Sequence, residues 1–447
     1  MATQAVAQEG VFTAENRGPV AAGLVSMILQ TYDISLPALV LPAAITYFIP
    51  ATLPPVVQAT IVTLTGVVST LGNPVGGVGL APFADRVGRR TLMLITNIGY
   101  TVIAAAIALL PGYAAWGYWS IGLLLFLRFC NGVFAASSPA GAIPMALERT
   151  SKRARGIIGA VLGIGPTCGV LLLSLIQNGS LGIAGTPAAF VQWGWRLPFW
   201  FGALLGIVET FLTLRTHDLD YFTQQQQQPT HRRRFTLVEV FSRKNIGIFA
   251  QTMIMYLGFL FLAVNIPVFI PTLFITYLHQ PPAEITTVLT LGSIGVLILA
   301  LVLGAWAQRI GRRRGLIIGG LTTLVIVTPL FGWMIFAGSH HGSPATILIL
   351  GTLVDAIGLS FYSGIGLTYL TERYPLDIRA AGFGAVYSLS TIIPGFSSFY
   401  LLALRAFMPY QYTVLVLVAI AGVLVTWGAW AGPETKDFDM LTPANPS

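Results

Sequence analysis

The chain has 447 residues, of which 55% are hydrophobic and only 9% are charged, and its mean hydropathy is +0.77. Soluble domains usually carry about 25% charged residues, so this composition excludes a protein whose main solvent is water. Both cysteines, Cys130 and Cys168, lie in apolar stretches, which indicates neither a disulfide framework nor a cysteine metal site. We expect an all-α membrane protein with the lipid bilayer as a partner and no metal or cofactor.

Twelve stretches are long and apolar enough to cross a membrane, since a helix needs roughly 20 apolar residues to span about 30 Å of hydrocarbon. The first 20 residues are polar and lack the features of a signal peptide, so we expect the first helix to be retained. The predicted spans are 21–48, 55–82, 91–111, 119–147, 156–178, 196–214, 246–277, 285–308, 315–337, 345–372, 380–404 and 411–432.

The positions of the basic residues determine the predicted orientation. With a cytoplasmic N-terminus, every Lys and Arg except Arg128, Arg196 and Arg405 lies on the cytoplasmic side or at a cytoplasmic helix end. This is the positive-inside asymmetry, and it accounts for the net charge of +8 without a nucleic-acid partner. We expect a multi-pass protein of the cell inner (plasma) membrane with both termini in the cytoplasm.

The chain contains an internal repeat. Residues 85–90 read Asp-Arg-Val-Gly-Arg-Arg between the second and third spans, and residues 308–313 read Gln-Arg-Ile-Gly-Arg-Arg between the eighth and ninth. A glutamate that precedes an arginine by seven residues follows both the fourth and the tenth span, at Glu148 with Arg155 and at Glu372 with Arg379. Because the two pairs of motifs have nearly the same offset, they indicate duplication of a six-helix unit.

The repeat divides the chain into two homologous halves joined by a polar linker. The linker contains five consecutive glutamines and a basic cluster, which cannot bury enough apolar surface to fold. A short amphipathic helix is expected near 235–244, and binding of a regulator is an alternative role. The predicted segments are the cytoplasmic N-terminal tail (1–20), the N-terminal half (21–214), the cytoplasmic linker (215–245), the C-terminal half (246–432) and the cytoplasmic C-terminal tail (433–447).

The loop at 85–90, preceded by Gly79 and Pro82, resembles the signature between helices 2 and 3 of the major facilitator superfamily. The resemblance implies the major facilitator fold, twelve transmembrane helices in two six-helix halves, and a cytoplasmic latch that holds the outward-facing state. Gln308 replaces the acid in the second copy, so we expect a weaker second latch. The implied latch residues are Asp85, Arg86, Gly88, Arg89 and Arg90, with Gln308, Arg309, Gly311 and Arg312 in the second copy.

Within that superfamily the chain looks most like the metabolite:proton symporters. The matching pieces are Tyr32-Asp33, Arg128 with Gly132, and the run from Trp193 to Phe199 before the sixth span. The chain departs from that family at Asn73, where arginine is frequent, and at Ser137-Ser138, where Gly-Glu is frequent. These departures concern the substrate. Gly165-Pro166 in the fifth span is similar to part of the motif of drug:proton antiporters, which supports an exporter as an alternative function.

Charged side chains at membrane depth cost about 2.5 to 3.5 kcal/mol on insertion scales and indicate functional sites. Asp33, Arg128 and Asp355 lie near the middle of predicted helices, whereas Glu209 lies nearer the cytoplasmic end of the sixth span, where Arg215 could neutralise it. No histidine lies at this depth, so a proton path must use carboxyl groups, whose neutral form is favoured by desolvation. Asp33 and Asp355 are the expected proton-coupling residues.

A polar stripe on the fourth predicted helix provides the expected substrate contacts. Arg128, Asn131 and Ser138 share one helical face with Ala135. A guanidinium group matches a carboxylate in shape and charge, so a lone arginine in a cavity favours an anionic substrate. The alternative is an arginine that braces the helices by pairing with Asp33.

The second half supplies the remaining expected substrate contacts. Asp355 and Tyr362 lie on one face of the tenth predicted helix, and the repeat places Asp355 opposite Asn131, one turn from the counterpart of Arg128. The two halves are therefore expected to present opposite charges toward one central site. Asn265 in the seventh helix and Tyr387 in the eleventh add groups that can form hydrogen bonds.

These features predict secondary active transport, namely proton-coupled uptake of a small organic anion by alternating access. The expected partners are the small-molecule substrate and protons, and we expect a monomer. The alternatives are a proton-coupled exporter of a drug or metabolite, and a symporter of a sugar, polyol or zwitterionic osmolyte. No metal-ligand spacing, nucleophile elbow or phosphate loop appears, so an enzyme is not expected.

The predicted topology can be checked with reporter fusions. A reporter that is active only in the cytoplasm, fused after Arg234 or at the C-terminus, should be active at both positions because the basic residues keep these segments inside. Fusions after Trp116, between the third and fourth predicted spans, should be inactive. An inactive reporter at either of the two cytoplasmic positions would contradict the twelve-helix assignment.

Overall fold

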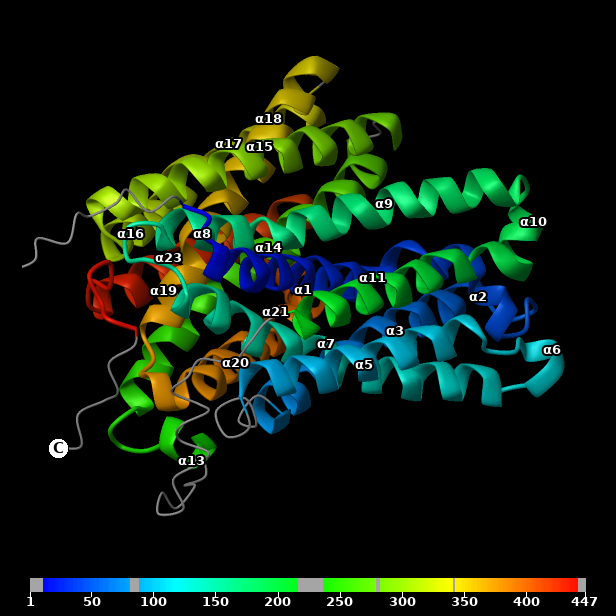
Figure 1. Ribbon diagram of the computed structural model, residues 1–447. Coiled ribbons are helices and arrows are strands. Elements are labelled where there is room, and N and C mark those ends of the chain that lie inside the picture. The colour runs from blue at the N-terminus through cyan, green and yellow to red at the C-terminus, as the bar shows by residue number, and fades with distance from the viewer. Residues whose placement is uncertain (1–10, 81–87, 216–235, 279–281, 341, 441–447) are drawn as a thin grey trace, which may run out of the picture.

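The computed structural model describes residues 11–80, 88–215, 236–278, 282–340 and 342–440, and these residues form a bundle of long helices without a strand (Figure 1). The N-terminal half contains α1 (Ala14–Leu39), α2 (Leu41–Phe48), α3 (Pro55–Pro74), η1 (Val75–Leu80), α5 (Arg89–Ala108), α6 (Tyr113–Trp116), α7 (Trp119–Glu148), α8 (Arg155–Gly163), α9 (Gly165–Ala184), α10 (Pro187–Ala189), η2 (Phe190–Gly194) and α11 (Arg196–Leu214).

The C-terminal half repeats this arrangement. It contains α13 (Thr236–Val240), α14 (Ile246–Thr276), α15 (Pro282–Ile310), α16 (Arg312–Thr322), η3 (Thr323–Val327), α17 (Thr328–Ser339), α18 (Pro344–Phe361), η4 (Tyr362–Gly366), α19 (Leu367–Glu372), η5 (Leu376–Ile378), α20 (Arg379–Leu389), α21 (Ile392–Gly395), α22 (Ser397–Leu404) and α23 (Tyr410–Ala431). The short helix α13 lies within the region where the linker sequence predicts one.

The helices agree closely with the predicted spans. Among the described residues, 11 helices are long and apolar enough to cross a membrane, and the predicted second span corresponds to α3 followed by η1. The first helix begins at Ala14, earlier than the predicted residue 21. The reason is a capping box, in which Thr13 Oγ1 accepts from the backbone N–H of Asn16 and Asn16 Oδ1 accepts from that of Thr13.

The ends of the helices are called cytoplasmic and periplasmic according to the orientation that the basic residues predict. The tryptophan-rich run before the sixth span holds the periplasmic end of the N-terminal half together. Trp195 is fully buried and packs against Phe48 and Phe199. Arg196 donates from Nε to the backbone carbonyl of Ala108 at 3.0 Å and from Nη2 to the Tyr47 hydroxyl at 2.6 Å. The ends of α2, α5 and α11 are thereby joined, so this arginine has a structural use at the membrane surface.

The distribution of buried apolar residues shows which side of the membrane is closed. One large cluster contains residues of both halves, among them Met27 and Leu147 with Tyr256 and Tyr369, and it extends to the cytoplasmic helix ends. Toward the periplasmic ends, each half has a cluster of its own. The two halves therefore share a core on the cytoplasmic side. In Figure 1, the shared region lies at the left, where α8 of the N-terminal half contacts α15 and α19 of the C-terminal half.

Glycines allow the two halves to approach closely on that side. A side chain at Gly159 of α8 would collide with Thr368 of α19, and one at Gly163 would collide with the backbone of Ser363 in η4. A second seam between the halves forms where η1 meets α20, because a side chain at Gly77 would collide with Ser388. Small residues at such seams let helix backbones pack in direct contact within a membrane.

The seam between α8 and η4 can be tested by adding volume. Gly159→Val should force the halves apart on the cytoplasmic side, because overpacking costs about 1 to 3 kcal/mol, which shifts a conformational equilibrium about 5-fold to 150-fold. A cysteine placed at buried Ser363 in a background without Cys130 and Cys168 should then react faster with a membrane-impermeant thiol reagent in inside-out vesicles.

Gly179→Val is the matched control, since a side chain at Gly179 of α9 has no atom within 4 Å to collide with. Labelling at Ser363→Cys should be unchanged in that variant. Equal labelling in the Gly159 variant and its parent would contradict the closed seam.

Candidate functional site

Two acids and a polar stripe lie inside the N-terminal half. Asp33 of α1 and Arg128 of α7 form an ion pair of 2.9 Å and are both fully buried. Arg128 Nη2 also donates to the backbone carbonyl of Asp33 at 2.9 Å, and Asn131 Nδ2 donates to Asp33 Oδ1 at 2.6 Å. Two of these donors thus reach the carboxylate oxygen Oδ1 and the third reaches the backbone of the same residue, so Arg128 and Asn131 hold both the side chain and the main chain of Asp33.

The ion pair is not fully satisfied. Asp33 Oδ2, Arg128 Nε and Asn131 Oδ1 are buried and have no hydrogen-bond partner among the described residues. Buried polar atoms without partners are rare in folded proteins, and each one calls for an explanation such as a ligand or a change of conformation. The group therefore has unused donors and acceptors although its charges are balanced.

The predicted stripe on α7 faces the interior of its own half. Arg128 and Asn131 contact α1, while Ala135 packs with Leu29 of α1 and Tyr100 of α5. Ser138, at the end of the stripe, forms hydrogen bonds to α1, α5 and α11. All of these contacts lie within the N-terminal half, whereas the sequence pattern predicts a stripe along the cavity between the halves.

Glu209 of α11 is the second buried acid of this half. Its Oε1 lies 2.6 Å from the Ser138 hydroxyl, and its side chain has no measurable exposure. The expectation that Arg215 neutralises it is wrong, because the Arg215 guanidinium lies 4.2 Å above the exposed ring of Phe211 at the end of the helix. The spacing of six residues places Arg215 on a different side of α11 and close to water.

In the C-terminal half, Asp355 of α18 is buried against α15. Its carboxyl group lies so close to Gly292 that any side chain there would collide with it, and Asp355 Oδ1 has no hydrogen-bond partner among the described residues. Among those residues, Asp355 forms no ion pair with Arg128, which instead pairs with Asp33. The expected opposition of charges across the two halves is therefore not seen in this conformation.

The two halves meet near mid-membrane in a cluster of tyrosines. Tyr387 of α20 donates to Gln30 of α1 at 2.5 Å, which joins the C-terminal half to the N-terminal half. The hydroxyls of Tyr256 (α14) and Tyr362 (η4) lie 3.1 Å apart, and the ring of Tyr256 lies 5.5 Å from that of Tyr387. Two predicted residues, Tyr362 and Tyr387, are thus brought together.

Sequence reasoning did not select Tyr256 or its neighbour Phe259. Nothing distinguishes them among the 15 tyrosines and 26 phenylalanines of the chain, because α14 is apolar on all sides. The other predicted contact, Asn265, donates to the carbonyl of Phe261 and to Ser397 at 3.0 Å. The bond to Ser397 joins α14 to α22 inside the C-terminal half.

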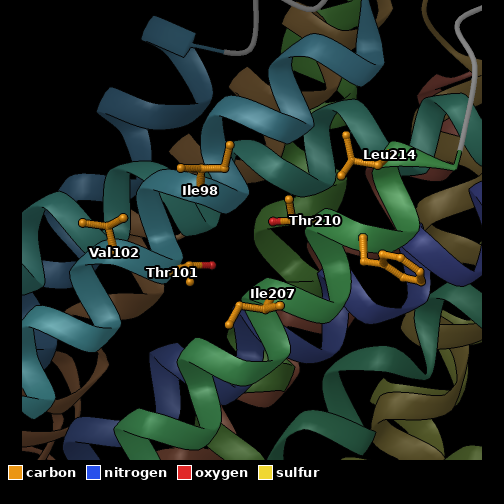
Figure 2. Close-up of a pocket in the computed structure, with 7 residues that line it drawn as sticks. Ile98, Thr101, Val102, Ile207, Thr210 and Leu214 are labelled. Carbon is orange, nitrogen blue, oxygen red and sulfur yellow. The ribbon is translucent and has the colours of Figure 1, made fainter.

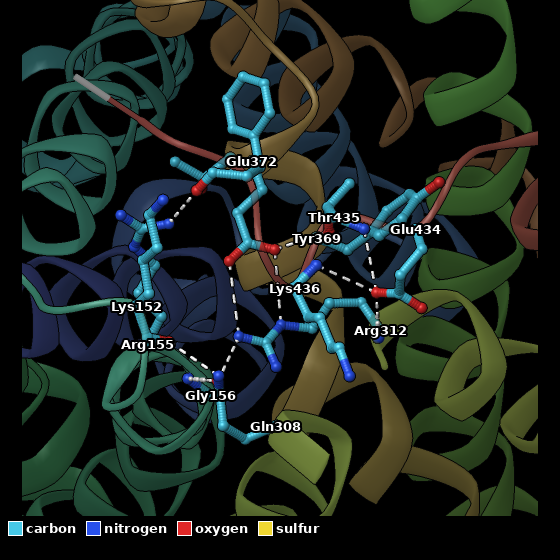
Figure 3. A network of polar contacts seen from close by, with 12 residues as sticks. Lys152, Arg155, Gly156, Gln308, Arg312, Tyr369, Glu372, Glu434, Thr435 and Lys436 are labelled. Carbon is cyan, nitrogen blue, oxygen red and sulfur yellow. Dashed lines mark hydrogen bonds and ion pairs between the residues drawn. The ribbon is translucent and has the colours of Figure 1, made fainter. Parts of the chain in front are cut away.

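The second copy of the predicted latch joins the halves directly (Figure 3). Gln308 Nε2 donates to the carbonyl of Lys152 at 2.8 Å, and Gln308 Oε1 accepts from the backbone N–H of Gly156 and from Arg312. Arg312 is buried and also pairs with Glu372 at 3.5 Å. Glutamine serves here as both donor and acceptor, a role that an ionised carboxylate cannot fill.

The two latch loops share one backbone shape. Gly88 and Gly311 have φ angles of 101° and 103°, a conformation that favours glycine, and they precede α5 and α16, which begin at Arg89 and Arg312. Arg90 donates to the carbonyl of Leu214 at 3.0 Å. Asp85 and Arg86 lie outside the described residues, and Arg309 accepts through its carbonyl from Lys436.

The C-terminal tail completes the cytoplasmic closure. Glu434 accepts from the backbone N–H groups of Arg312 and Arg313 at 2.7 and 3.1 Å and so caps α16. Farther along, the carbonyl of Phe438 accepts from Arg155 and that of Met440 accepts from Arg379. Arg155 belongs to the N-terminal half and Arg379 to the C-terminal half. The tail therefore bridges both halves.

A direct ion pair lies beside this bridge. Glu148 at the end of α7 pairs with Arg379 at the start of α20 at 2.8 Å, and both side chains are fully buried. These are the glutamate and arginine that the repeated motif singles out, one from each half. Glu148 of the first copy therefore pairs with the arginine of the second copy, whereas Glu372 pairs with Arg312 of its own half.

A groove of about 310 Å³ between α5 and α11 faces away from these groups (Figure 2). Its lining is apolar except for two threonines, and several of its residues are half exposed in the isolated chain, as expected for a lipid-facing surface. The lining residues are Ile98, Thr101, Val102, Ile207, Thr210, Phe211 and Leu214.

Comparison with known proteins identifies the family. The profile of the Major Facilitator Superfamily matches residues 23–273 and 249–439. The proline/betaine transporter of Escherichia coli (strain K12) is 25% identical over 403 residues, covering 87% of this chain and 78% of that protein. The citrate-proton symporter of Salmonella typhi is 28% identical over 334 residues, covering 73% of each chain.

The fold is shared with a solved proton:xylose symporter, XylE, bound to 6-bromo-6-deoxy-D-glucose, with a TM-score of 0.75 and 15% identity over 96% of this chain and 98% of that one. The predicted fold of two six-helix halves is confirmed, and so is the resemblance to metabolite:proton symporters. The matched proteins are transporters and not enzymes. The chain is a multi-pass membrane transporter that belongs to the Major Facilitator Superfamily.

Proposed function

We propose that this transporter is a proton-coupled symporter that takes up a small carboxylate-bearing metabolite by alternating access. The observation that carries the proposal is the hydrogen bond between Gln30 and Tyr387, which links the two halves inside a cluster of tyrosines. In facilitator folds the substrate site lies near the bilayer midplane between the halves. The groups at this junction are thus in position to bind a substrate and to sense its presence.

The chemistry of the junction suits a carboxylate attached to a compact body. The hydroxyls of Tyr256, Tyr362 and Tyr387 and the amide of Gln30 can donate hydrogen bonds to carboxylate oxygens. The tyrosine rings offer apolar faces, which also attract a cationic group. Proline, betaine and citrate, which give the two relatives above their names, all carry a carboxylate. The first two are zwitterions and the third is an anion.

Arg128 has a supporting role in this proposal. Its charge is balanced by Asp33, so it does not present a free positive charge to a substrate. Asp33 lies on α1 three residues, or about one helical turn, from Gln30, so the pair fixes the helix that carries Gln30. Asp355, which has no ion-pair partner among the described residues, stays a candidate for proton coupling in the C-terminal half.

Transport in proteoliposomes tests the proposed function. With an inwardly directed pH gradient, radiolabelled proline, betaine or citrate should accumulate, and xylose should not. Tyr387→Phe removes the hydroxyl that bonds Gln30 and should raise KM roughly 5-fold to 30-fold, because a hydrogen bond is worth about 1 to 2 kcal/mol.

Tyr118→Phe is the control, because Tyr118 is 62% exposed on the periplasmic side and its ring contact with Tyr113 does not need the hydroxyl. Its KM should equal that of the wild type. Accumulation that ignores the pH gradient, or a Tyr387 variant with unchanged KM, would contradict the proposal.

The supporting role of the ion pair can be measured by a double-mutant cycle. Arg128→Gln should leave Asp33 uncompensated and destabilise the protein by about 3 to 5 kcal/mol, seen as a lower Tm in detergent. Asp33→Asn combined with Arg128→Gln should recover much of that loss. Arg405→Gln, at an exposed position, should leave Tm unchanged. Additive losses in the double variant would show that the two side chains do not act as a pair.

A further inference from the structure

The carboxyl group of Glu209 is unusual because it has no cation to balance it. It is fully buried among α1, α5, α7 and α11, and no Lys, Arg or His among the described residues lies within ion-pairing distance. Its hydrogen-bonding neighbours, Ser26, Asn97 and Ser138, are all neutral side chains, and Oε2 has no partner among the residues that the structure describes. An ionised carboxylate buried without a cation would cost much free energy, so the position of the carboxyl proton matters for this group.

Three short contacts meet at the hydroxyl oxygen of Ser138. It lies 2.9 Å from Ser26 Oγ, 2.9 Å from Asn97 Oδ1 and 2.6 Å from Glu209 Oε1. Each such contact between two oxygens needs one proton between them. The hydroxyls of Ser26 and Ser138 supply two protons. A proton on Glu209 supplies the third.

The amide of Asn97 cannot supply that proton. Its Nδ2 donates to Thr213 Oγ1 at 3.3 Å, and Thr213 Oγ1 donates to the backbone carbonyl of Glu209 at 2.8 Å. If the amide were rotated by 180°, Asn97 Oδ1 would face the Thr213 hydroxyl, whose proton is already donated to the carbonyl of Glu209. The oxygen of Asn97 therefore faces Ser138, where it can only accept.

We propose that Glu209 is a neutral acid in this cytoplasmically closed conformation and that it binds and releases the proton that drives transport. This inference rests on the proposed proton-coupled function. The proton is taken from water on the periplasmic side, held as the O–H of Glu209, and given up to water on the cytoplasmic side. Only O–H bonds form and break, so no further reactant is needed.

The same contacts explain how proton loss would move helices. Without the proton on Glu209, two hydroxyl protons remain for three contacts at Ser138, so one contact must lengthen. Ser138 belongs to α7, and its three partners belong to α1, α5 and α11. Deprotonation therefore loosens α7 from one of its neighbours. Protonation restores the closed packing.

The other titratable and charged groups around Glu209 are few. On α5, Arg90 binds the carbonyls of Thr213 and Leu214 at the cytoplasmic end of α11, and the buried Tyr100 interacts electrostatically with both Asp33 and Glu209. On α1 and α7, Asp33 and Arg128 balance each other. On α11, Arg215 faces water. Since Thr213 is one turn from Glu209 and contacts Arg90, the cytoplasmic side offers the shorter exit for the proton.

Infrared spectroscopy tests the protonation directly and needs no substrate. The purified wild type at neutral pH should show the carbonyl stretch of a neutral carboxylic acid that is missing in Glu209→Gln and retained in Glu15→Gln, a change at an exposed position. If Glu209→Gln does not fold, Ser138→Ala should shift the band, since the acid loses its acceptor. A wild-type spectrum identical to that of the Glu209 variant, or a band unaffected by Ser138→Ala, would overturn the proposal.

Transport tests the coupling. Glu209→Gln keeps a donor to Ser138 and imitates the protonated acid, so counterflow of proline, betaine or citrate should continue at near the wild-type rate. Accumulation driven by a pH gradient of one unit, about tenfold for one proton per substrate, should fall to simple equilibration. Wild-type accumulation in this variant would overturn the proposal. If the wild type transports none of the three compounds, the proposed function fails, whereas the infrared band still reports on Glu209.

Discussion

Lipid cannot hydrogen bond, and this constraint organises the whole N-terminal half. Every polar side chain at membrane depth must find a partner inside the protein. Arg128 and Asn131 both donate to Asp33, and Ser26, Asn97, Ser138 and Glu209 form a second group. Both groups use the same faces of α1 and α7, so these faces turn inward. Gln30 lies one turn from both Ser26 and Asp33 on α1, so the helix that these two groups hold in place also carries the side chain that accepts from Tyr387 of the C-terminal half.

The cytoplasmic side is closed by contacts of several different kinds. Glycines remove the side chains that would separate α8 from η4 and α19, and a buried ion pair joins Glu148 to Arg379. Gln308 adds hydrogen bonds to backbone groups of the opposite half. Opening requires all of these contacts to separate. The ion pair and the Gln308 bonds do not involve the tyrosines of the proposed substrate junction, whereas η4 carries both Ser363 of the glycine seam and Tyr362 of that junction.

Sequence reasoning predicts the fold well because membrane spans depend on long-range composition. The spans, the repeat and the paired latch loops follow from apolar length and from motifs such as Gly88 and Gly311. The site is harder to predict, because it depends on which way a helix face turns. The stripe at Arg128 is correctly placed on one face, yet only tertiary packing shows that this face contacts Asp33. The unselected Tyr256 has no local signal at all.

The C-terminal tail bonds to the arginines of both halves through backbone carbonyls of Phe438 and Met440. A carbonyl is present whatever the residue, so substitutions at Phe438, which is 38% exposed, should be selectively neutral as long as the spacing from Glu434 is kept. Insertions and deletions in this segment should instead be removed by selection, because they would shift these carbonyl groups away from the arginines. Divergent family members are thus expected to preserve the length of this tail more faithfully than its composition.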